Sequence, residues 1–418
     1  MNIYPPFKNE LENFSEDQQF RVIISFADLS SREQFIKKND QLKILGKLEL
    51  IPSILVNLKK KQIINYENEE LIKNIEEDQI IYPALLDVIE ILELNDYKNS
   101  EITYSGKNVN VGIIDNGINR NIPAISSISL KKQKIFDIQK PLKMEVEKSE
   151  ISHATIMASI IGNRFQDIDN NFIGIAPNVN VIDFDISNSN QEYSFYNILN
   201  VFDKIYTEKI DLDILFITLT TKNSSDGKDI LSSACNILTE KEIIIVCPAG
   251  NNGPNPYSIG SPGAAKKVIT IGALTKELEI PNFSGRGPTL DETKKPDFCF
   301  PGFKIKVPIT NDLRLSVSGT SVSAAICVGI IALIKEYDPN ISYDILMDLL
   351  AKTSIDLGYD KSIQGLGTVK VSQIFSNLDL FHEKLIPYNY LIKKSLRISI
   401  EFLILLIILF YFFFFFRI

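Results

Sequence analysis

The chain has 418 residues, of which 45% are hydrophobic and 23% charged, so it has the composition of a globular protein with a sizeable core. Asp and Glu number 52 against 44 Lys and Arg, and the formal net charge of −8 argues against a general nucleic-acid binder. The four cysteines have neither metal-site nor redox spacing, which predicts free, buried thiols. Any imidazole chemistry must use one of the two histidines, His153 or His382.

The N-terminal region is predicted to be a separate module. Residues 1–95 hold 11 Lys and Arg against 17 Asp and Glu, so most of the net negative charge lies there. No basic segment followed by an apolar run opens the chain, so no secretory signal is predicted. The hydrophobic pattern predicts, in order, a strand over Arg21–Phe26, a helix over Ser30–Lys38, two apolar strands within 42–58, a helix over Glu67–Glu76 and a strand over Gln79–Tyr82. This order is that of a small βαββαβ domain.

Residues 100–378 are predicted to form an α/β domain. Apolar, β-branched runs typical of buried parallel strands begin at Val109, Val179, Ile214, Ile243 and Val268. Segments of helical length separate these runs, over 152–161, 193–207 and 229–241. The alternation predicts a doubly wound parallel sheet, and active sites in such folds gather at the carboxyl ends of the strands.

Three residues of this domain have the chemistry of a nucleophilic triad. Asp115 follows the first strand, His153 opens a helix, and Ser321 leads into an apolar helix that runs to about Lys335. A hydroxyl needs an imidazole to take its proton, and a carboxylate then orients the imidazole and stabilises the cation that forms. The order Asp, His, Ser is one of the known chain orders. Asn251 directly follows another strand, where its amide could donate to an oxyanion.

Seven motifs in order make the chain resemble the subtilases, the subtilisin-like serine proteases. They are Gly106–Gly117, His153–Thr155, Gly174–Pro177, Pro248–Asn251, Phe283–Pro288, Lys295–Asp297 with Pro301–Gly302, and Gly319–Ser321. The resemblance covers roughly residues 20–375 and implies a serine endopeptidase that acts on peptides or proteins. It further implies that Asp115, His153 and Ser321 are the triad, that Asn251 is the oxyanion donor, and that no cofactor is needed.

The same resemblance assigns a substrate groove and a propeptide. The groove walls would be Leu219, Thr220, Gly250 and Gly263. The module over residues 1–95 is similar to subtilase propeptides, which act as folding chaperones and as intramolecular inhibitors. Autoprocessing is then expected between residues 83 and 105.

Departures from the family pattern leave open whether the chain is an active enzyme and how specific it is. Ala154 stands where the family has Gly after the catalytic His, and Thr220 replaces a Gly of the strand that pairs with substrate. A β-branched residue at 220 would crowd the groove, so either the specificity is narrowed or the alignment is shifted. The alternative to an active enzyme is a catalytically impaired subtilase-fold scaffold or binding protein at the membrane. The polar loop with Asp167, Asp169, Asn170 and Asn171 only hints at the family's calcium loop, and such loops are more often solvated turns, so no metal site is predicted.

The C-terminal segment is predicted to be a transmembrane helix. Phe402 to Phe416 are 15 consecutive apolar or aromatic residues, and the apolar segment extends back to Ile398 with two polar interruptions. A helix over 398–416 would reach roughly 28 Å, about the thickness of a hydrocarbon core. A buried or interfacial helix is the alternative. Lys393, Lys394 and Arg397 precede the run against Arg417 alone after it, which predicts a single-pass anchor with a cytoplasmic catalytic domain.

Overall fold

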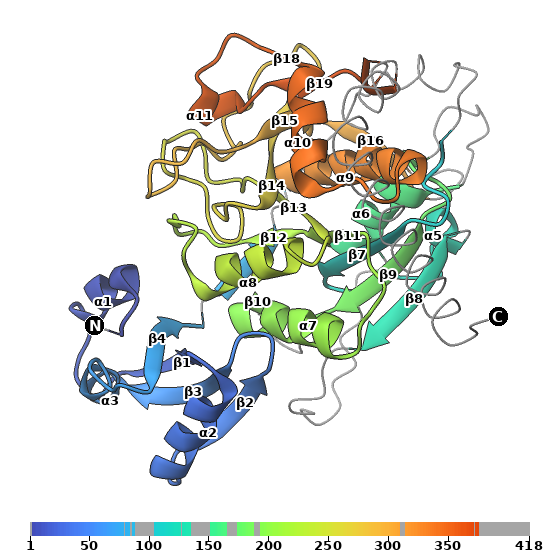
Figure 1. The fold of residues 1–418 in the computed structure, drawn as a ribbon. Helices are drawn as coiled ribbons and strands as arrows, with labels where there is room; N and C mark the ends of the chain where they lie inside the picture. Colours follow the sequence, from blue (N-terminus) through green and yellow to red (C-terminus); the bar gives the residue numbers. More distant parts are fainter. Residues whose placement is uncertain are drawn as a thin grey trace, which may run out of the picture.

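The computed structural model shows an N-terminal domain joined to a larger α/β domain (Figure 1). The structure describes residues 2–78, 80–83, 86–87, 104–126, 128–134, 151–164, 174–187, 193–309, 314–371 and 373–375. Several predictions therefore lie outside the described residues: the domain boundaries at 95, 100 and 378, the Asp- and Asn-rich loop, His382 and the apolar tail over 398–416.

The larger domain is built on a seven-stranded sheet in the order β15-β14-β13-β11-β7-β9-β8, in which all neighbours are parallel. The strands are β7 (Asn110–Asp115), β8 (Ser129–Lys134), β9 (Asn180–Asp185), β11 (Ile214–Ile217), β13 (Ile244–Pro248), β14 (Val268–Leu274) and β15 (Phe298–Pro301). All five runs predicted as strands are strands. Helices cover both faces of this sheet, which is why its central strands are apolar along their whole length.

Two helices on each face form the outer layers. Helices α6 (His153–Gly162) and α9 (Thr320–Tyr337) share one apolar cluster, and α7 (Phe195–Thr207) and α8 (Ile230–Thr239) share the other. The remaining helices of this domain that the structure describes are α5 (Pro123–Ser126), α10 (Tyr343–Lys352) and α11 (Lys361–Gln364). Within the described part of the chain, α9 is the one helix long and apolar enough to cross a membrane, but 89% of it is buried. It is apolar all round because it lies in the core.

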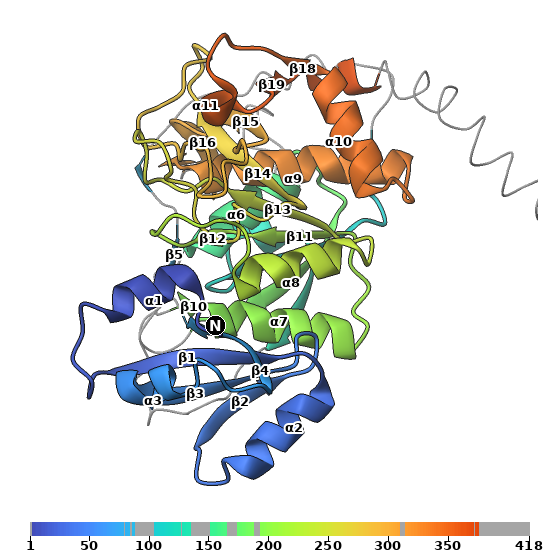
Figure 2. The ribbon, with the colours of Figure 1, turned by 60° about the vertical axis from the view of Figure 1, so that its left-hand side comes forward.

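The N-terminal domain is a four-stranded antiparallel sheet in the order β2-β3-β1-β4. Its elements are α1 (Pro5–Leu11), β1 (Gln19–Phe26), α2 (Leu29–Lys38), β2 (Ile44–Leu48), β3 (Ser53–Lys59), α3 (Lys60–Asn65) and β4 (Ile72–Glu77). One face packs with Phe35 of α2 and Ile63 of α3 in the domain's own core. The other face places Ile23 and Leu55 in one cluster with Tyr196 of α7, so the sheet lies against the larger domain (Figure 2).

The predicted helix over Glu67–Glu76 is wrong. The helix that follows β3 is α3, which ends at Asn65, and residues 72–77 form β4 beside β1. The segment is rich in Glu and Lys, which favour helix, but Ile72 and Ile75 are buried in the domain core, and this packing outweighs local propensity. The expected strand over Gln79–Tyr82 exists as β5 (Ile80–Pro83), but it does not join the N-terminal sheet.

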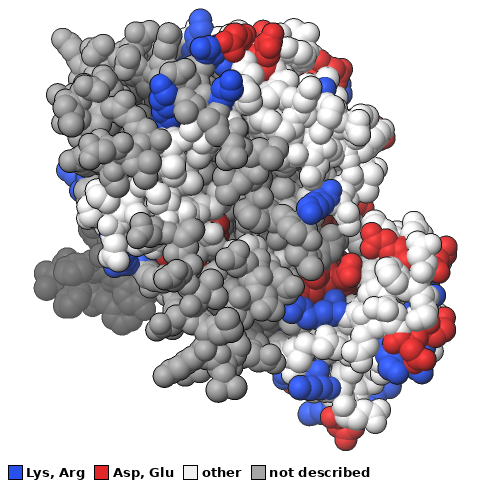
Figure 3. Space-filling view, turned by 180° about the vertical axis from the view of Figure 1, so that it is seen from behind, with Lys and Arg blue, Asp and Glu red and all other residues white. Residues whose placement is uncertain are grey.

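Acidic and basic side chains are interspersed over the N-terminal domain, as the view from behind shows (Figure 3). Exposed lysines pair with exposed or half-buried acids, as in Lys38 with Glu69 and Lys59 with Asp17. Two of the acids of this domain, Glu76 and Asp78, are instead buried. Part of the acidic excess that the sequence shows therefore belongs to the seam between the domains rather than to a surface patch.

Two buried carboxylates dock the N-terminal domain on helix N-termini of the larger domain. Glu76 Oε2 accepts a hydrogen bond from the backbone N–H of Ile230 in α8 at 2.8 Å. Asp78 Oδ1 accepts one from the backbone N–H of Tyr196 in α7, also at 2.8 Å, and Asp78 Oδ2 pairs with Arg21. The first N–H groups of a helix lack intrahelical acceptors, so these hydrogen bonds stabilise both helices.

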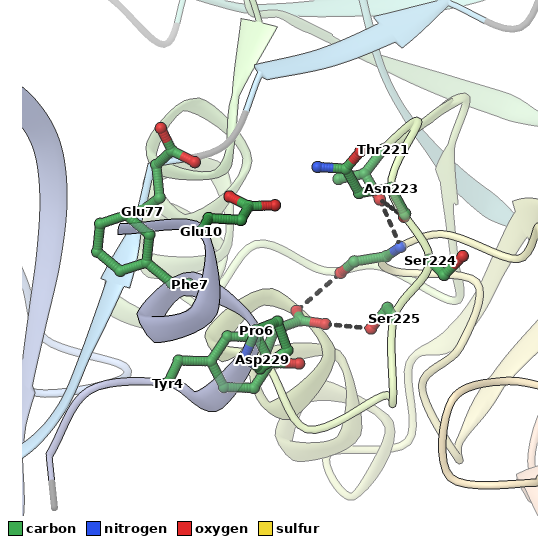
Figure 4. A pocket seen from close by; sticks show the side chains of 11 residues that line it. Tyr4, Pro6, Phe7, Glu10, Glu77, Thr221, Asn223, Ser224, Ser225 and Asp229 are labelled. Atoms are coloured by element: carbon green, nitrogen blue, oxygen red, sulfur yellow. Dashed lines mark hydrogen bonds between the residues drawn. The ribbon is translucent and has the colours of Figure 1, made fainter. Parts of the chain in front are cut away.

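A small cavity lies beside this seam, between α1 and the loop over residues 221–225 (Figure 4). Glu10 of α1 and Glu77 of β4 line it, together with Asp229 at the start of α8. The hydroxyl of Tyr4 donates to Asp226 next to it. Burial, with Asp229 and Asp226 nearby, raises the pKa of Glu76 from 4.5 to about 8 although Ile230 and Asn74 donate to its carboxylate.

We predict that docking of the two domains weakens as the pH rises. The pKa of Glu76 is about 8 in the docked state and 4.5 in the undocked state, so docking retains a proton that the undocked side chain releases above about pH 4.5. The contribution of Glu76 to the stability of the docked state is therefore full below pH 4.5 and is lost as the pH rises toward 8. The loss is at most about 1.4 kcal/mol per pH unit. Thermal unfolding of the full chain carrying Ser321→Ala measures it between pH 5 and 8. Glu76→Gln should flatten this dependence, whereas Glu70→Gln, at an exposed position, should not; equal slopes in all three proteins would contradict the prediction.

Candidate active site

The structure brings Asp115, His153 and Ser321 together at the carboxyl edge of the sheet. Asp115 ends β7, His153 begins α6 and Ser321 lies in the first turn of α9. His153 Nδ1 lies 2.5 Å from Asp115 Oδ2, and His153 Nε2 lies 3.1 Å from Ser321 Oγ. A carboxylate can only accept, so Nδ1 carries the proton and Nε2 accepts the hydroxyl proton of Ser321. The arrangement can transfer a proton from the serine to the imidazole.

Neighbouring groups fix the orientation of the acid and of the helix that carries the imidazole. The other oxygen of Asp115 accepts the backbone N–H of Asn116 at 2.7 Å. Asn116 Oδ1 in turn accepts the backbone N–H of Ala154, one residue after His153, at 3.1 Å. Ser152 caps the same helix by accepting the N–H of Thr155. Sequence reasoning did not single out Asn116, although its place directly after the acid was a usable signal.

Asn251 lies beside the serine with its amide held in one orientation. Its Oδ1 accepts the backbone N–H and the hydroxyl of Thr320, at 3.0 and 2.9 Å. A backbone N–H can only donate, so these bonds identify the oxygen of the amide and leave Nδ2 directed elsewhere. Nδ2 is buried, and no acceptor within the described part of the chain bonds to it. Burying a donor without an acceptor costs about 1–3 kcal/mol of free energy. An oxygen atom that accepts from Nδ2 would remove this cost.

Segments on both sides of residues 84 and 85 pair with strands that flank the serine. Strand β5 lies between β10 (Tyr193–Ser194) and β12 (Leu219–Thr220) and is antiparallel to both. On the other side β6 (Leu86–Asp87) pairs with β17 (Arg314–Ser318), which also pairs with β16 (Ile305–Pro308). Leu86 lies opposite Ser318, three residues before Ser321. A peptide can therefore be held in an extended conformation across the site.

The four residues predicted as groove walls lie near β12 and the end of β13. Leu219 and Thr220 form β12, where they lie opposite Pro83 and Tyr82 of β5. Gly250 precedes Asn251 with a φ of 93°, a conformation that favours glycine. A Cβ on Gly250 would lie 3.3 Å from Cγ2 of Thr220, and one on Gly263 would lie 3.3 Å from the carbonyl oxygen of Pro248. The methyl group of Thr220 therefore packs closely against Gly250.

Two other chemistries have little support in the described residues. All four cysteines are free and buried, as predicted, and burial raises the pKa of Cys247 to about 12, so this thiol near the site stays protonated. No group of three potential ligands that could hold a metal ion occurs among the residues that the structure describes. The hydroxyl of Ser321, by contrast, lies within hydrogen-bonding distance of His153 Nε2.

Comparison with known proteins agrees with this geometry. The profile of the subtilase family matches residues 106–370. The chain is 27% identical over 299 residues to the serine protease AprX of Bacillus subtilis, covering 64% of this chain and 66% of that protein. It is 26% identical over 261 residues to the minor extracellular protease Epr of the same species, covering 61% of this chain and 36% of Epr. The chain thus spans just under two thirds of AprX and about a third of Epr.

A solved structure shares the fold. The crystal structure of fervidolysin from Fervidobacterium pennivorans, described as a keratinolytic enzyme related to subtilisin, superposes with a TM-score of 0.65. The match has 16% sequence identity and covers 87% of this chain and 61% of fervidolysin. At that identity it shows the fold alone. Because the family profile covers well over half of the chain, this protein belongs to the subtilase family of serine proteases.

Proposed function

We propose that the chain is a serine endopeptidase that uses Asp115, His153, Ser321 and Asn251. Ser321 Oγ attacks the carbonyl carbon of a peptide bond while His153 Nε2 takes the hydroxyl proton, and Asp115 stabilises the resulting imidazolium. The oxygen that becomes negative accepts from Asn251 Nδ2 and from the backbone N–H of Ser321. His153 then gives its proton to the leaving amine, and water releases the acyl group by the same steps in reverse. The observation that carries the proposal is the continuous Asp115–His153–Ser321 contact beside a buried amide for which the described residues supply no acceptor.

Replacing Asn251 tests the proposed oxyanion site. We expect Asn251→Ala to lower kcat on a peptide substrate by about 10²- to 10³-fold, because one preorganised donor to the oxyanion is lost. Labelling of Ser321 by a fluorophosphonate should persist at a reduced rate, since the serine and histidine stay in contact, whereas Ser321→Ala should abolish labelling. An unchanged kcat would reassign the donor. Failure of the folded, processed wild type to label would favour the alternative, a catalytically impaired scaffold.

We propose further that the N-terminal domain is a propeptide that occupies the groove until it is cut. Three observations support this proposal. Strand β5 pairs with β10 and β12, and β6 pairs with β17, the strand that precedes Ser321. Glu76 and Asp78 accept hydrogen bonds from the N-termini of α8 and α7. In that register the chain's own substrate bond is one of the three between Pro83 and Leu86. This narrows the interval of 83–105 that the sequence allows.

Mass spectrometry of the active protein tests the propeptide proposal. The mature N-terminus should be residue 84, 85 or 86, because only these bonds lie between the segments paired on the two sides of Ser321. The Ser321→Ala chain, which lacks the nucleophile, should stay uncut. An active enzyme that retains residues 1–83 covalently, or a first cut beyond residue 105, would contradict the proposal.

We propose that the apolar segment over 398–416 tethers the protease to a membrane, with the catalytic domain on the cytoplasmic side. Its support is the run of apolar residues with Lys393, Lys394 and Arg397 before it. Deleting residues from Ile398 onward should move peptidase activity from the membrane pellet to the supernatant. Leu405→Asp, which places a charge in the middle of the segment, should weaken membrane association in the full chain. Sedimentation of the deleted form with membranes would contradict tethering.

A further inference from the structure

The side chain of Thr220 is held between Ser261 and Gly250. Its hydroxyl donates to the carbonyl oxygen of Ser261 at 3.2 Å, which holds the side chain in one rotamer. Its methyl carbon lies 3.3 Å from the position that a Cβ on Gly250 would occupy. The methyl group therefore lies between β12 and the segment that carries Asn251. With β5 paired to β12, Thr220 is 4% exposed.

The strand register shows which substrate side chain meets this methyl group. Residues directly opposite in an antiparallel pair project to the same face, and successive residues alternate between faces. Tyr82 lies opposite Thr220, so in a substrate held like β5 the residue two positions later projects to the same face as Thr220. The proposed mechanism brings the carbonyl of the residue before the scissile bond to Asn251, which directly follows Gly250. The residue two positions after the one opposite Thr220 fits this place, and its side chain then faces the Thr220 methyl group, which packs against Gly250.

The chain itself has a small residue at the position that corresponds to the residue before the scissile bond. Two positions after Tyr82 the sequence has Ala84, followed by Leu85 and Leu86. Cleavage after position 84 also lies within the interval that β5 and β6 leave between them. The structural observation and the sequence observation are independent, since one concerns the packing of Thr220 and the other the amino-acid sequence that follows β5.

We infer that Thr220 restricts this protease to peptide bonds that follow a small residue, namely Gly, Ala or Ser. The inference rests on the proposed endopeptidase function and deepens it. A long or aromatic side chain would have to displace the Thr220 methyl group, which the bond to Ser261 holds in place. A misfit of this size in a pocket discriminates by roughly 10- to 200-fold. The chain's own cut then falls between Ala84 and Leu85.

Peptides that copy residues 79–88 test the inference. The processed enzyme is assayed on a series in which position 84 is Gly, Ala, Ser, Leu or Phe. We expect kcat/KM for the Ala peptide to exceed that for the Phe peptide by at least about 10-fold. Thr220→Gly should raise the Phe-to-Ala ratio by about 10-fold or more, and Thr220→Ser, which keeps the hydroxyl but lacks the methyl group, should also raise it.

A matched variant separates crowding from the loss of the hydrogen bond. Thr220→Val keeps two branches on Cβ without the hydroxyl, so the Phe-to-Ala ratio should stay near that of the wild type. Fluorophosphonate labelling of Ser321 in each variant shows that the site is assembled. Equal cleavage of Ala and Phe peptides by the wild type would overturn this inference while leaving the peptidase proposal intact. No cleavage of any peptide by enzyme that does not label would overturn both.

Discussion

The contact between His153 and Ser321 depends on two helices that begin at the same edge of one sheet. Helix α6 carries the histidine at its first residue and α9 carries the serine in its first turn. Both helices pack in one apolar cluster beneath the strands, and α9 is buried along nearly its whole length. Because a close-packed core leaves little freedom for rigid shifts, the 3.1 Å separation of the two side chains follows from the packing of the helices. Asp115 then needs only to end the neighbouring strand at the right residue.

Three N–H donors near that contact have no acceptor within the larger domain's own described helices: those at the N-termini of α7 and α8 and the amide of Asn251. The N-termini of α7 and α8 offer N–H groups that Asp78 and Glu76 accept, and this docking brings β5 to the groove. Asn251 Nδ2 is a third donor, buried beside the serine and without an acceptor among the residues that the structure describes. The first two are filled by the N-terminal domain itself, whereas the third is left for the substrate in the proposed mechanism. The N-terminal domain thus satisfies two donors of the larger domain through side chains that directly precede β5.

The sequence predicted the features that depend on local patterns. The β-branched runs gave the five strands, and the spacing of the motifs located Asp115, His153, Asn251 and Ser321, which the structure brings together. The failures concern contacts between distant segments. A segment rich in Glu and Lys became β4 because Ile72 and Ile75 pair and pack beside β1, and no local pattern reports that partner. A smaller difference is local: α2 begins at Leu29, one residue before the predicted start at Ser30, and Asp28 caps it by accepting the N–H of Ser31.

Strand β5 illustrates why pairing and selection are separate in this groove. Backbone hydrogen bonds to β10 and β12 accept almost any extended peptide, because they read the main chain and not the side chains. The groove therefore gains its selectivity from the few side chains that project between its walls. A glycine at position 220 would leave the pairing unchanged and widen that space, whereas the β-branched residue present supplies both a strand former and a steric limit. If Thr220 acts as inferred, the residue that departs from the family pattern is the residue that makes the protease selective.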